Sequence, residues 1–180
     1  IIGQLCAIPG IAVGNALARR FGKRDVFKTW LIVAGIMAAL FFVVPPSGIW
    51  AVLILSILFN FSWGVTMPLP WAMMADVADY SEWKFSRRAT GIVFAGIVVG
   101  LKVGLAIGGA VAGWLLNGYG YVANVVQTPT AVQGIRLSVS LFPVIALILC
   151  VIALFMYGIG KKTEYQMQDE LAERRKTYAA

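Results

Sequence analysis

The 180-residue sequence is 60% hydrophobic and only 13% charged, with a mean hydropathy of +0.83. Soluble domains average about 45–50% apolar and about 25% charged residues, so this composition excludes an ordinary soluble domain. The net charge of +7 does not indicate nucleic-acid binding, because the basic residues are confined to short segments between apolar stretches. The sequence therefore predicts an all-α, polytopic membrane protein.

Five apolar segments of suitable length follow one another along the chain. A helix crosses the hydrocarbon core with about 20 residues, and the sequence lacks the alternating polarity of transmembrane strands. The predicted helices span residues 2–17, 27–44, 49–74, 91–116 and 137–157. Residues 1–160 are thus predicted to form a transmembrane bundle, and residues 161–180 a tail whose Glu170–Arg174 spacing favours a solvated helix. Because the sequence begins with isoleucine inside an apolar run, we expect part of a longer protein.

Thirteen of the fifteen basic residues fall on one side of the predicted bundle. They lie within residues 18–28, 75–90 and 161–176, whereas the connections at 45–48 and 117–135 contain none. Five crossings place the three basic segments on the same face. The positive-inside rule makes that face, and the C-terminus with it, cytoplasmic.

The third segment is interrupted by Pro68 and Pro70, which free backbone carbonyls and bend a helix. Bent helices are tolerated in a bundle where they line a cavity, and transporters use broken helices at their substrate sites. Trp63 and Trp71 flank the bend. A tryptophan beside a polar cavity can stack on a sugar ring, but these residues alone favour a place in the core or in the interfacial belt.

Asp76 and Asp79 are three residues apart and share a helix face at the predicted cytoplasmic end. Arg87 and Arg88 follow after a short turn. These four charges could form a salt-bridge latch that closes one face of a bundle, or they could belong to a solvated loop. Exposed ion pairs contribute only about 0–1 kcal/mol, so only a buried latch would matter for function, and spacing does not decide between the two.

Lys102 is the only ionisable residue in the predicted helix Gly91–Leu116. It lies 11 residues from one end of that run and 14 from the other, so snorkelling would have to cover about half a bilayer. A lysine near the middle of a membrane span costs roughly 2.5–3.5 kcal/mol on insertion scales. Such a residue normally faces a protein interior or a water-filled cavity and has a partner, which favours a functional lysine.

Gly96, Gly100, Gly104 and Gly108 recur at every fourth position of the same predicted helix. Repeated small residues at this spacing allow two membrane helices to approach closely. At 100° per residue, Lys102 points away from this glycine ridge. We therefore expect the ridge to pack on a neighbouring helix while Lys102 faces a cavity.

Two segments carry a resemblance to a known family. Ala75–Gly91, with its Ala-Asp-x-x-Asp-Tyr-x-Glu-Trp-Lys string, and Gly100-Leu-Lys-Val-Gly104 resemble the glycoside–pentoside–hexuronide:cation symporters, the family of the melibiose carrier within the major facilitator superfamily. The basic loop Leu17–Arg24 is also similar to the superfamily's short cytoplasmic loop motif. The resemblance covers essentially the whole chain and implies helices 8–12 of a twelve-helix transporter. It implies transport of a sugar or glycoside coupled to Na⁺ or H⁺ by alternating access, in a bacterial inner membrane.

The resemblance also implies roles for individual residues. Lys102 matches the family's functional lysine near the sugar and cation sites, and Met67, between Trp63 and Trp71, aligns with the family's helix-10 tryptophan. Val98 stands where the melibiose carrier has a polar residue before that lysine. The implied substrate-contacting residues are therefore Lys102, Met67, Trp63, Trp71 and Val98. The implied cytoplasmic gate consists of Asp76, Asp79, Arg87 and Arg88. The carboxylates for sugar and cation belong to the N-terminal half, an expected partner of this chain, and neither a cofactor nor a metal site is expected here.

Two other functions compete with this interpretation. A family member for anionic sugars, such as hexuronides or sulfonated sugars, could pair Lys102 directly with the anion. A non-transporting membrane scaffold is the alternative from another class, and it should tolerate Lys102→Leu. An enzyme is disfavoured because the sequence has no histidine, no nucleophile paired with a base and no cluster of metal ligands.

Overall fold

The computed structural model describes residues 2–45 and 48–179, so residues 46 and 47 of the predicted 45–48 connection lie outside the described part, as do residues 1 and 180. The regular structure of the described residues is entirely helical. The helices are α1 (Ile2–Leu5), α2 (Ala7–Phe21), α3 (Lys23–Val43), α4 (Ile49–Thr66), α5 (Leu69–Phe85), α6 (Thr90–Gly118), α7 (Pro129–Val139), α8 (Leu141–Phe155) and α9 (Lys161–Ala179).

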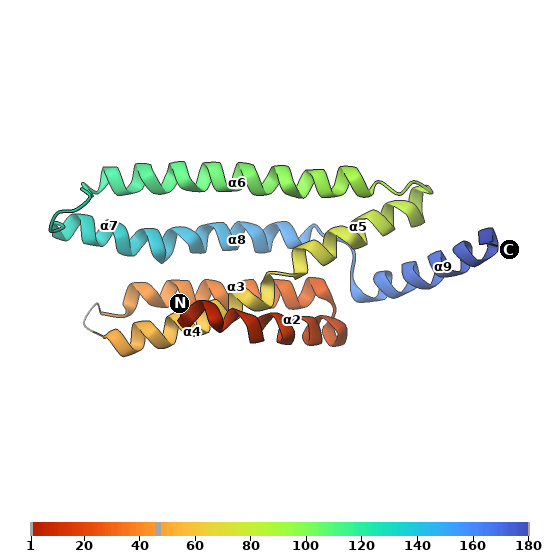
Figure 1. Ribbon diagram of the computed structural model, residues 1–180, viewed down its shortest axis with the longest axis horizontal. Coiled ribbons are helices and arrows are strands. Elements are labelled where there is room, and N and C mark those ends of the chain that lie inside the picture. The colour runs from red at the N-terminus through yellow and green to blue at the C-terminus, as the bar shows by residue number, and fades with distance from the viewer. Residues whose placement is uncertain (1, 46–47, 180) are drawn as a thin grey trace.

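The helices form a layered bundle (Figure 1). One layer is α6, a second is α7 with α8, and a third contains α2, α3 and α4, while α5 crosses from the third layer to the start of α6. Four stretches of the described chain are long and apolar enough to cross a membrane: Lys23–Val43, Ile49–Phe85, Thr90–Gly118 and Pro129–Phe155. The predicted all-α membrane bundle is thus confirmed.

The first predicted membrane helix, residues 2–17, is interrupted near its start. A turn at Cys6 separates α1 from α2, and α2 has only 15 residues. That length is below the usual minimum of about 17 residues for a membrane span. Four of the five predicted segments thus coincide with stretches long enough to cross a membrane, and residues 2–21 form two shorter helices.

Residues 18–28 form two helix ends rather than a loop. α2 continues to Phe21, α3 begins at Lys23, and Gly22 between them has a φ of 93°. A Cβ is strained in this conformation, which explains the glycine at the turn. The prediction from hydrophobicity started the second helix at residue 27, four residues after the start of α3. Hydrophobicity detects only the apolar part of a helix and misses its charged first turn.

The predicted bend at the two prolines is present. α4 ends at Thr66 and α5 begins at Leu69, with Pro68 at the N-cap and Pro70 in the first turn. Proline is well placed there because the first backbone N–H groups of a helix have no helical acceptor. α5 then continues to Phe85, so much of the predicted loop at 75–90 is helical.

The predicted helix at 137–157 begins earlier than expected and is interrupted. Thr128 caps α7 by accepting a hydrogen bond from the backbone N–H of Ala131 at 3.2 Å, and Pro129 occupies the first helical position. Ser140 then separates α7 from α8, three residues before Pro143, which cannot donate a helical hydrogen bond. The threonine–proline pair was the start signal that hydrophobicity did not detect.

The tail helix α9 differs from the predicted solvated helix because one side of it is packed. Met167 is fully buried and Leu171 is 4% exposed, one helical turn apart. α9 contacts the far end of α5, at the end of the bundle where the α2–α3 turn also lies (Figure 1). The three basic segments therefore gather at this end of the bundle, which we call the basic end.

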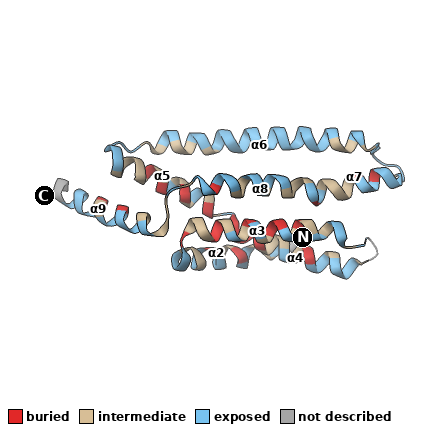
Figure 2. Ribbon diagram, turned by 180° about the vertical axis from the view of Figure 1, so that it is seen from behind, coloured by how far each residue is buried: buried red, intermediate tan, exposed pale blue. Residues whose placement is uncertain are grey.

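The buried core lies where α3, α8 and the α4–α5 bend meet. Its members are Val26, Phe27, Leu31, Val65, Leu69, Met73 and Leu154. At the opposite end of the bundle, Arg136 donates to the carbonyls of Phe42 (2.6 Å) and Val44 (3.3 Å), which end α3. In contrast, the described residues of α6 include none that is buried (Figure 2).

The closest backbone approach found among the described glycines joins α2 to α4. A Cβ built on Gly10 or Gly14 would overlap backbone atoms of α4, and a Cβ on Gly64 would overlap the backbone of Ala7. Gly10 and Gly14 have the small-xxx-small spacing that permits such contact between membrane helices. In the described structure, Gly10, Gly14 and Gly64 therefore pack closely against a neighbouring backbone, whereas the glycine ridge of α6 does not.

We expect Gly14→Ala to destabilise the protein by about 1–3 kcal/mol, because the new methyl group overpacks a backbone contact. Thermal unfolding in detergent measures this effect. Gly35→Ala is the matched control, since a Cβ there meets only Leu147 Cδ1 at 3.9 Å, an ordinary contact. Equal unfolding temperatures for the two variants would contradict the close packing of α2 on α4.

Candidate functional site

Lys102 lies near the middle of α6, 12 residues after Thr90 and 16 before Gly118. At 1.5 Å per residue it is about 18 Å and 24 Å from the two helix ends. Its side chain is exposed, and it makes no hydrogen bond or ion pair with any residue that the structure describes. A lysine at this depth in a membrane requires a polar partner or water-filled cavity, which the described residues do not supply.

Trp63, Met67 and Trp71 follow one another at four-residue intervals across the bend between α4 and α5. They are 50%, 59% and 42% exposed, so the core does not cover this stripe. Val98 on α6 is 41% exposed as well. The four predicted substrate-contacting side chains other than Lys102 are thus open to whatever adjoins the bundle, and their assignment to substrate remains a prediction.

The glycine ridge of α6 has no packing partner within the described structure. A Cβ built on Gly96, Gly100, Gly104 or Gly108 meets no atom of the described residues within 4 Å. Gly104 and Gly108 border an open groove toward α7 and α8, lined also by Ser138. The expected close packing of this ridge on a helix therefore remains a prediction about a surface outside this chain.

At the basic end, Asp76 forms a buried ion pair with Lys23 at the start of α3. The Lys23 Nζ lies 2.6 Å and 2.8 Å from the two Asp76 carboxylate oxygens and 2.9 Å from Glu164 Oε1 on α9. Asp76 is 5% exposed. One ammonium therefore joins three helices, with a carboxylate on either side of it.

Asp79 belongs to a second group of charges, in which partly buried carboxylates meet exposed arginines. Arg88 lies 3.3 Å from Asp79 and 3.6 Å from Glu82, while Arg175 of α9 lies 2.9 Å from Glu82 and 3.9 Å from Asp79. Arg87 is exposed, and its backbone carbonyl accepts a hydrogen bond from the Ser81 hydroxyl. Of the four predicted gate residues, Asp76 thus pairs with Lys23, Asp79 and Arg88 belong to the second group, and Arg87 takes part through its backbone carbonyl. They do not form one four-membered latch.

Trp83 connects the tail helix to the end of α5. Its indole Nε1–H donates to Glu170 Oε2 at 2.6 Å, and its backbone carbonyl accepts from Arg174 at 3.1 Å. The hydrogen bonds from Trp83 and Gln166 to the Glu170 carboxylate hold the pKa of Glu170 below its ordinary value. Docking of α9 therefore favours the ionised form of Glu170.

This linkage predicts an acid-sensitive tail. The contribution of Glu170 to docking is fully present above the ordinary pKa of a glutamate and is lost as the pH falls through the lowered pKa. We expect Trp83→Phe, which removes the indole donor, to speed amide hydrogen exchange in α9 near neutral pH, and acidification to speed it in the unaltered protein. Trp50→Phe is the matched control because Trp50 is 80% exposed at the opposite end of the bundle. Unchanged exchange in Trp83→Phe would contradict this role.

Sequence reasoning missed the partners supplied by other helices. Lys23, Glu164 and Arg175 were treated as topogenic or tail charges, yet Lys23 pairs with Asp76, Glu164 with Lys23, and Arg175 lies near Asp79. They are 53, 88 and 96 positions from those aspartates, and no local spacing connects residues so far apart. The sequence offered one indication of these contacts: the segments that carry the basic and acidic residues were all predicted at the cytoplasmic face.

Residues 1–161 match the family described as MFS/sugar transport protein. The chain belongs to this family. The match confirms the resemblance drawn from the Ala75–Gly91 and Gly100–Gly104 segments, and it identifies the bundle as part of an integral membrane transporter.

Three curated proteins that are similar to this chain are named for different substrates. A protein of Escherichia coli named as a glycoside/cation symporter, YagG, is 37% identical over 88% of the chain and 32% of its own length. Proteins of Salmonella typhimurium named as a sulfoquinovose importer and a 2,3-dihydroxypropane-1-sulfonate exporter are 31% and 30% identical over 96% of the chain, and 36% and 37% of their own lengths. The chain thus spans about a third of the length of these relatives, which are named as transporters rather than enzymes.

Proposed function

We propose that this chain is the C-terminal part of a symporter that carries a sugar or glycoside together with Na⁺ or H⁺ by alternating access. Its membership of a sugar-transport family supports the class of activity. Lys102 carries the proposal, because this exposed cation lies in the middle of an otherwise uncharged 29-residue helix. A scaffold has no use for such a residue, whereas a transporter needs a polar group at the membrane midplane.

In this proposal, Lys102 reaches toward the substrate or toward a carboxylate of the N-terminal half. The exposed stripe of Trp63, Met67 and Trp71 would border the same cavity, with Val98 on α6. Substrate sites of such transporters lie near the midplane, next to interrupted helices, and the α4–α5 bend is an interrupted helix. The N-terminal half would supply the opposite wall and the groups that bind the coupling cation.

The gate in this proposal is at the basic end, which would face the cytoplasm of a bacterium and carry the C-terminus. Asp76 and Asp79, with Arg88 and the neighbouring Arg87, would hold that face closed and separate when the halves rock. The ion pair between Asp76 and Lys23 supports a gate with a buried component, because an exposed pair alone contributes little.

Uptake by the complete protein in proteoliposomes tests the proposal. We expect uptake of a labelled neutral glycoside to rise when an inward Na⁺ or H⁺ gradient is imposed, and to return to baseline when the gradient is collapsed. Empty liposomes and liposomes containing the 180-residue chain alone are the controls, and neither should accumulate sugar, because alternating access requires two halves. Gradient-independent accumulation, or none for any glycoside, would contradict symport.

A second candidate is a transporter of anionic sugars. Two relatives are named for sulfonated substrates, and Lys102 has no anionic partner among the described residues. Lys102 would then pair with the sulfonate or carboxylate of the substrate itself. Uptake of a sulfosugar and a hexuronide, measured beside the neutral glycoside, separates the candidates: competition only by the anionic sugars favours the second.

A further inference from the structure

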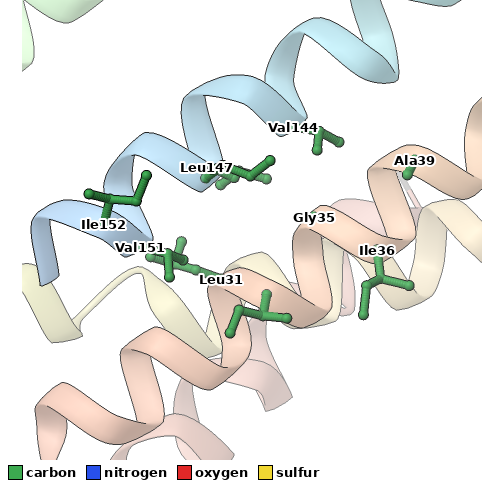
Figure 3. A pocket seen from close by; sticks show the side chains of 10 residues that line it. Leu31, Gly35, Ile36, Ala39, Val144, Leu147, Val151 and Ile152 are labelled. Carbon is green, nitrogen blue, oxygen red and sulfur yellow. The ribbon is translucent and has the colours of Figure 1, made fainter. Parts of the chain in front are cut away.

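A groove between α3 and α8 contains none of the candidate site residues discussed above (Figure 3). Its volume is about 310 Å³, and every side chain that lines it is aliphatic or belongs to glycine. The lining residues are Leu31, Ile32, Gly35, Ile36, Ala39, Val144, Leu147, Ile148, Val151 and Ile152. A sugar or an ion has no hydrogen-bonding partner here, so the groove suits only an apolar occupant.

The hollow lies where α3 carries two small residues, Gly35 and Ala39, among larger aliphatic ones. Gly35 is buried at the floor, where a Cβ would meet only Leu147 at 3.9 Å, and Ala39 follows one turn later. Ile36 and Ile152 form opposite rims and are 54% and 55% exposed. The groove therefore lies open along its length, with an apolar floor and apolar rims on both helices.

One end of the groove carries positive charge. Lys28 continues the α3 stripe one turn before Leu31, Phe155 continues the α8 stripe, and the Lys28 Nζ lies 5.1 Å from the Phe155 ring centroid. Arg24 donates to the Tyr157 carbonyl beside them. Asp25 lies 3.6 Å from Lys28 and 3.2 Å from Arg24, so these two cations and one carboxylate leave a net positive charge.

The groove has the length of one membrane leaflet. From Lys28 to Ala39 is 11 residues, about 16 Å of helix, and the hydrocarbon core is about 30 Å thick. Beyond Ala39, the last groove residue of α3, Arg136 of α7 donates to the Phe42 carbonyl and lies 5.6 Å from the Phe42 ring centroid. A transmembrane helix would need a groove along the whole span, whereas one acyl chain needs only its own leaflet.

We propose that this groove binds one acyl chain of an anionic phospholipid, with the lipid phosphate beside Lys28 and Arg24. Apolar packing along Gly35 and Ala39 holds the chain, and the cations at the basic end select the headgroup. Basic sites between membrane helices are known to recognise anionic lipid headgroups on the cytoplasmic side. The inference requires only that the bundle spans a membrane, so it stands independently of the sugar that is carried.

Photolabelling of the complete protein in phosphatidylcholine nanodiscs tests this proposal. The probe is phosphatidylglycerol with a photoactivatable group within its acyl chain. We expect mass spectrometry to locate the label on groove residues of α3 and α8, and unlabelled phosphatidylglycerol to compete better than phosphatidylcholine. Lys28→Gln should lower labelling about fivefold, from about 1 kcal/mol per basic residue near the surface. Lys162→Gln, which removes an exposed lysine from the same end, should leave it unchanged.

A second variant tests the binding of the acyl chain separately from that of the lipid headgroup. Gly35→Leu fills the floor without changing charge, so it should abolish labelling of the groove. Label on other surfaces only, equal competition by the two lipids, or full labelling of Lys28→Gln would each overturn the proposal. Protection of the groove by another helix of the protein, seen as cysteine cross-links from Ile36 or Ile152, would overturn it as well. The wild-type competition requires no variant, so a folding defect in Lys28→Gln leaves the proposal testable.

Discussion

Lys102→Leu is expected to abolish most sugar uptake while leaving the amount of protein in the membrane unchanged. A hydrogen bond to a charged group contributes about 1.5–3 kcal/mol, so its loss lowers uptake by about 10- to 150-fold. Insertion should not suffer, because the change removes a cost of roughly 2.5–3.5 kcal/mol at the bilayer centre. Initial uptake rates, normalised to membrane-inserted protein, measure the effect.

Two further variants make this result specific to Lys102. Lys102→Arg keeps the charge and should retain more uptake than Lys102→Leu. Lys162→Leu removes a charge from the exposed surface of α9 and should transport like the unaltered protein. Full uptake in Lys102→Leu would show that the lysine has no role in transport, and would return the scaffold hypothesis to consideration.

Lys23→Met is expected to cause the largest loss of stability of any single change at the basic end. Asp76 is 5% exposed, so removing its partner leaves a buried carboxylate without compensation, at a cost of about 3–5 kcal/mol. Asp76→Asn should cost less, because Lys23 is more exposed and keeps Glu164 at 2.9 Å. Thermal unfolding in detergent should rank the unaltered protein above Asp76→Asn, and Asp76→Asn above Lys23→Met.

The double variant Lys23→Met/Asp76→Leu provides the control for this asymmetry. Replacing a whole buried ion pair with apolar residues is often nearly neutral, so the double variant should recover much of the stability lost in Lys23→Met. Lys28→Met removes a lysine one turn further along α3 and should have a small effect, because its partner Asp25 is half-exposed. A double variant less stable than Lys23→Met would mean that the ion pair does not act as a unit.

The motif residues show which properties of the site can be predicted from short sequence patterns. The string from Ala75 and the segment around Lys102 were sufficient to predict the family, because long strings of specific residues rarely recur by chance. They did not predict that Asp76 pairs with Lys23, since that contact depends on how α3 and α5 pack. The α6 glycines resembled a helix-packing surface, whereas the observed close contact uses Gly10, Gly14 and Gly64.

The sequence by itself determined that this chain is a bundle of membrane helices with its charges at one end. Hydrophobicity and charge are properties of each segment, and a bilayer sorts segments by those properties without reference to their neighbours. Helix ends were less predictable. A capping residue such as Thr128 or a turn residue such as Gly22 ends a helix without a clear change in the hydrophobicity of the segment.

Only the tertiary structure decided which charges meet, which glycines pack and where a groove remains open. Lys23 reaches Asp76 and Glu164 because the starts of α3 and α9 meet the middle of α5, and the groove exists because Gly35 and Ala39 face the aliphatic wall of α8. Such contacts depend on the relative rotation and depth of helices, which side-chain packing between distant segments sets. Lys102 illustrates both: its position in the middle of a long apolar segment is evident from the sequence, whereas the packing of the described helices leaves it exposed and without an ion pair among them.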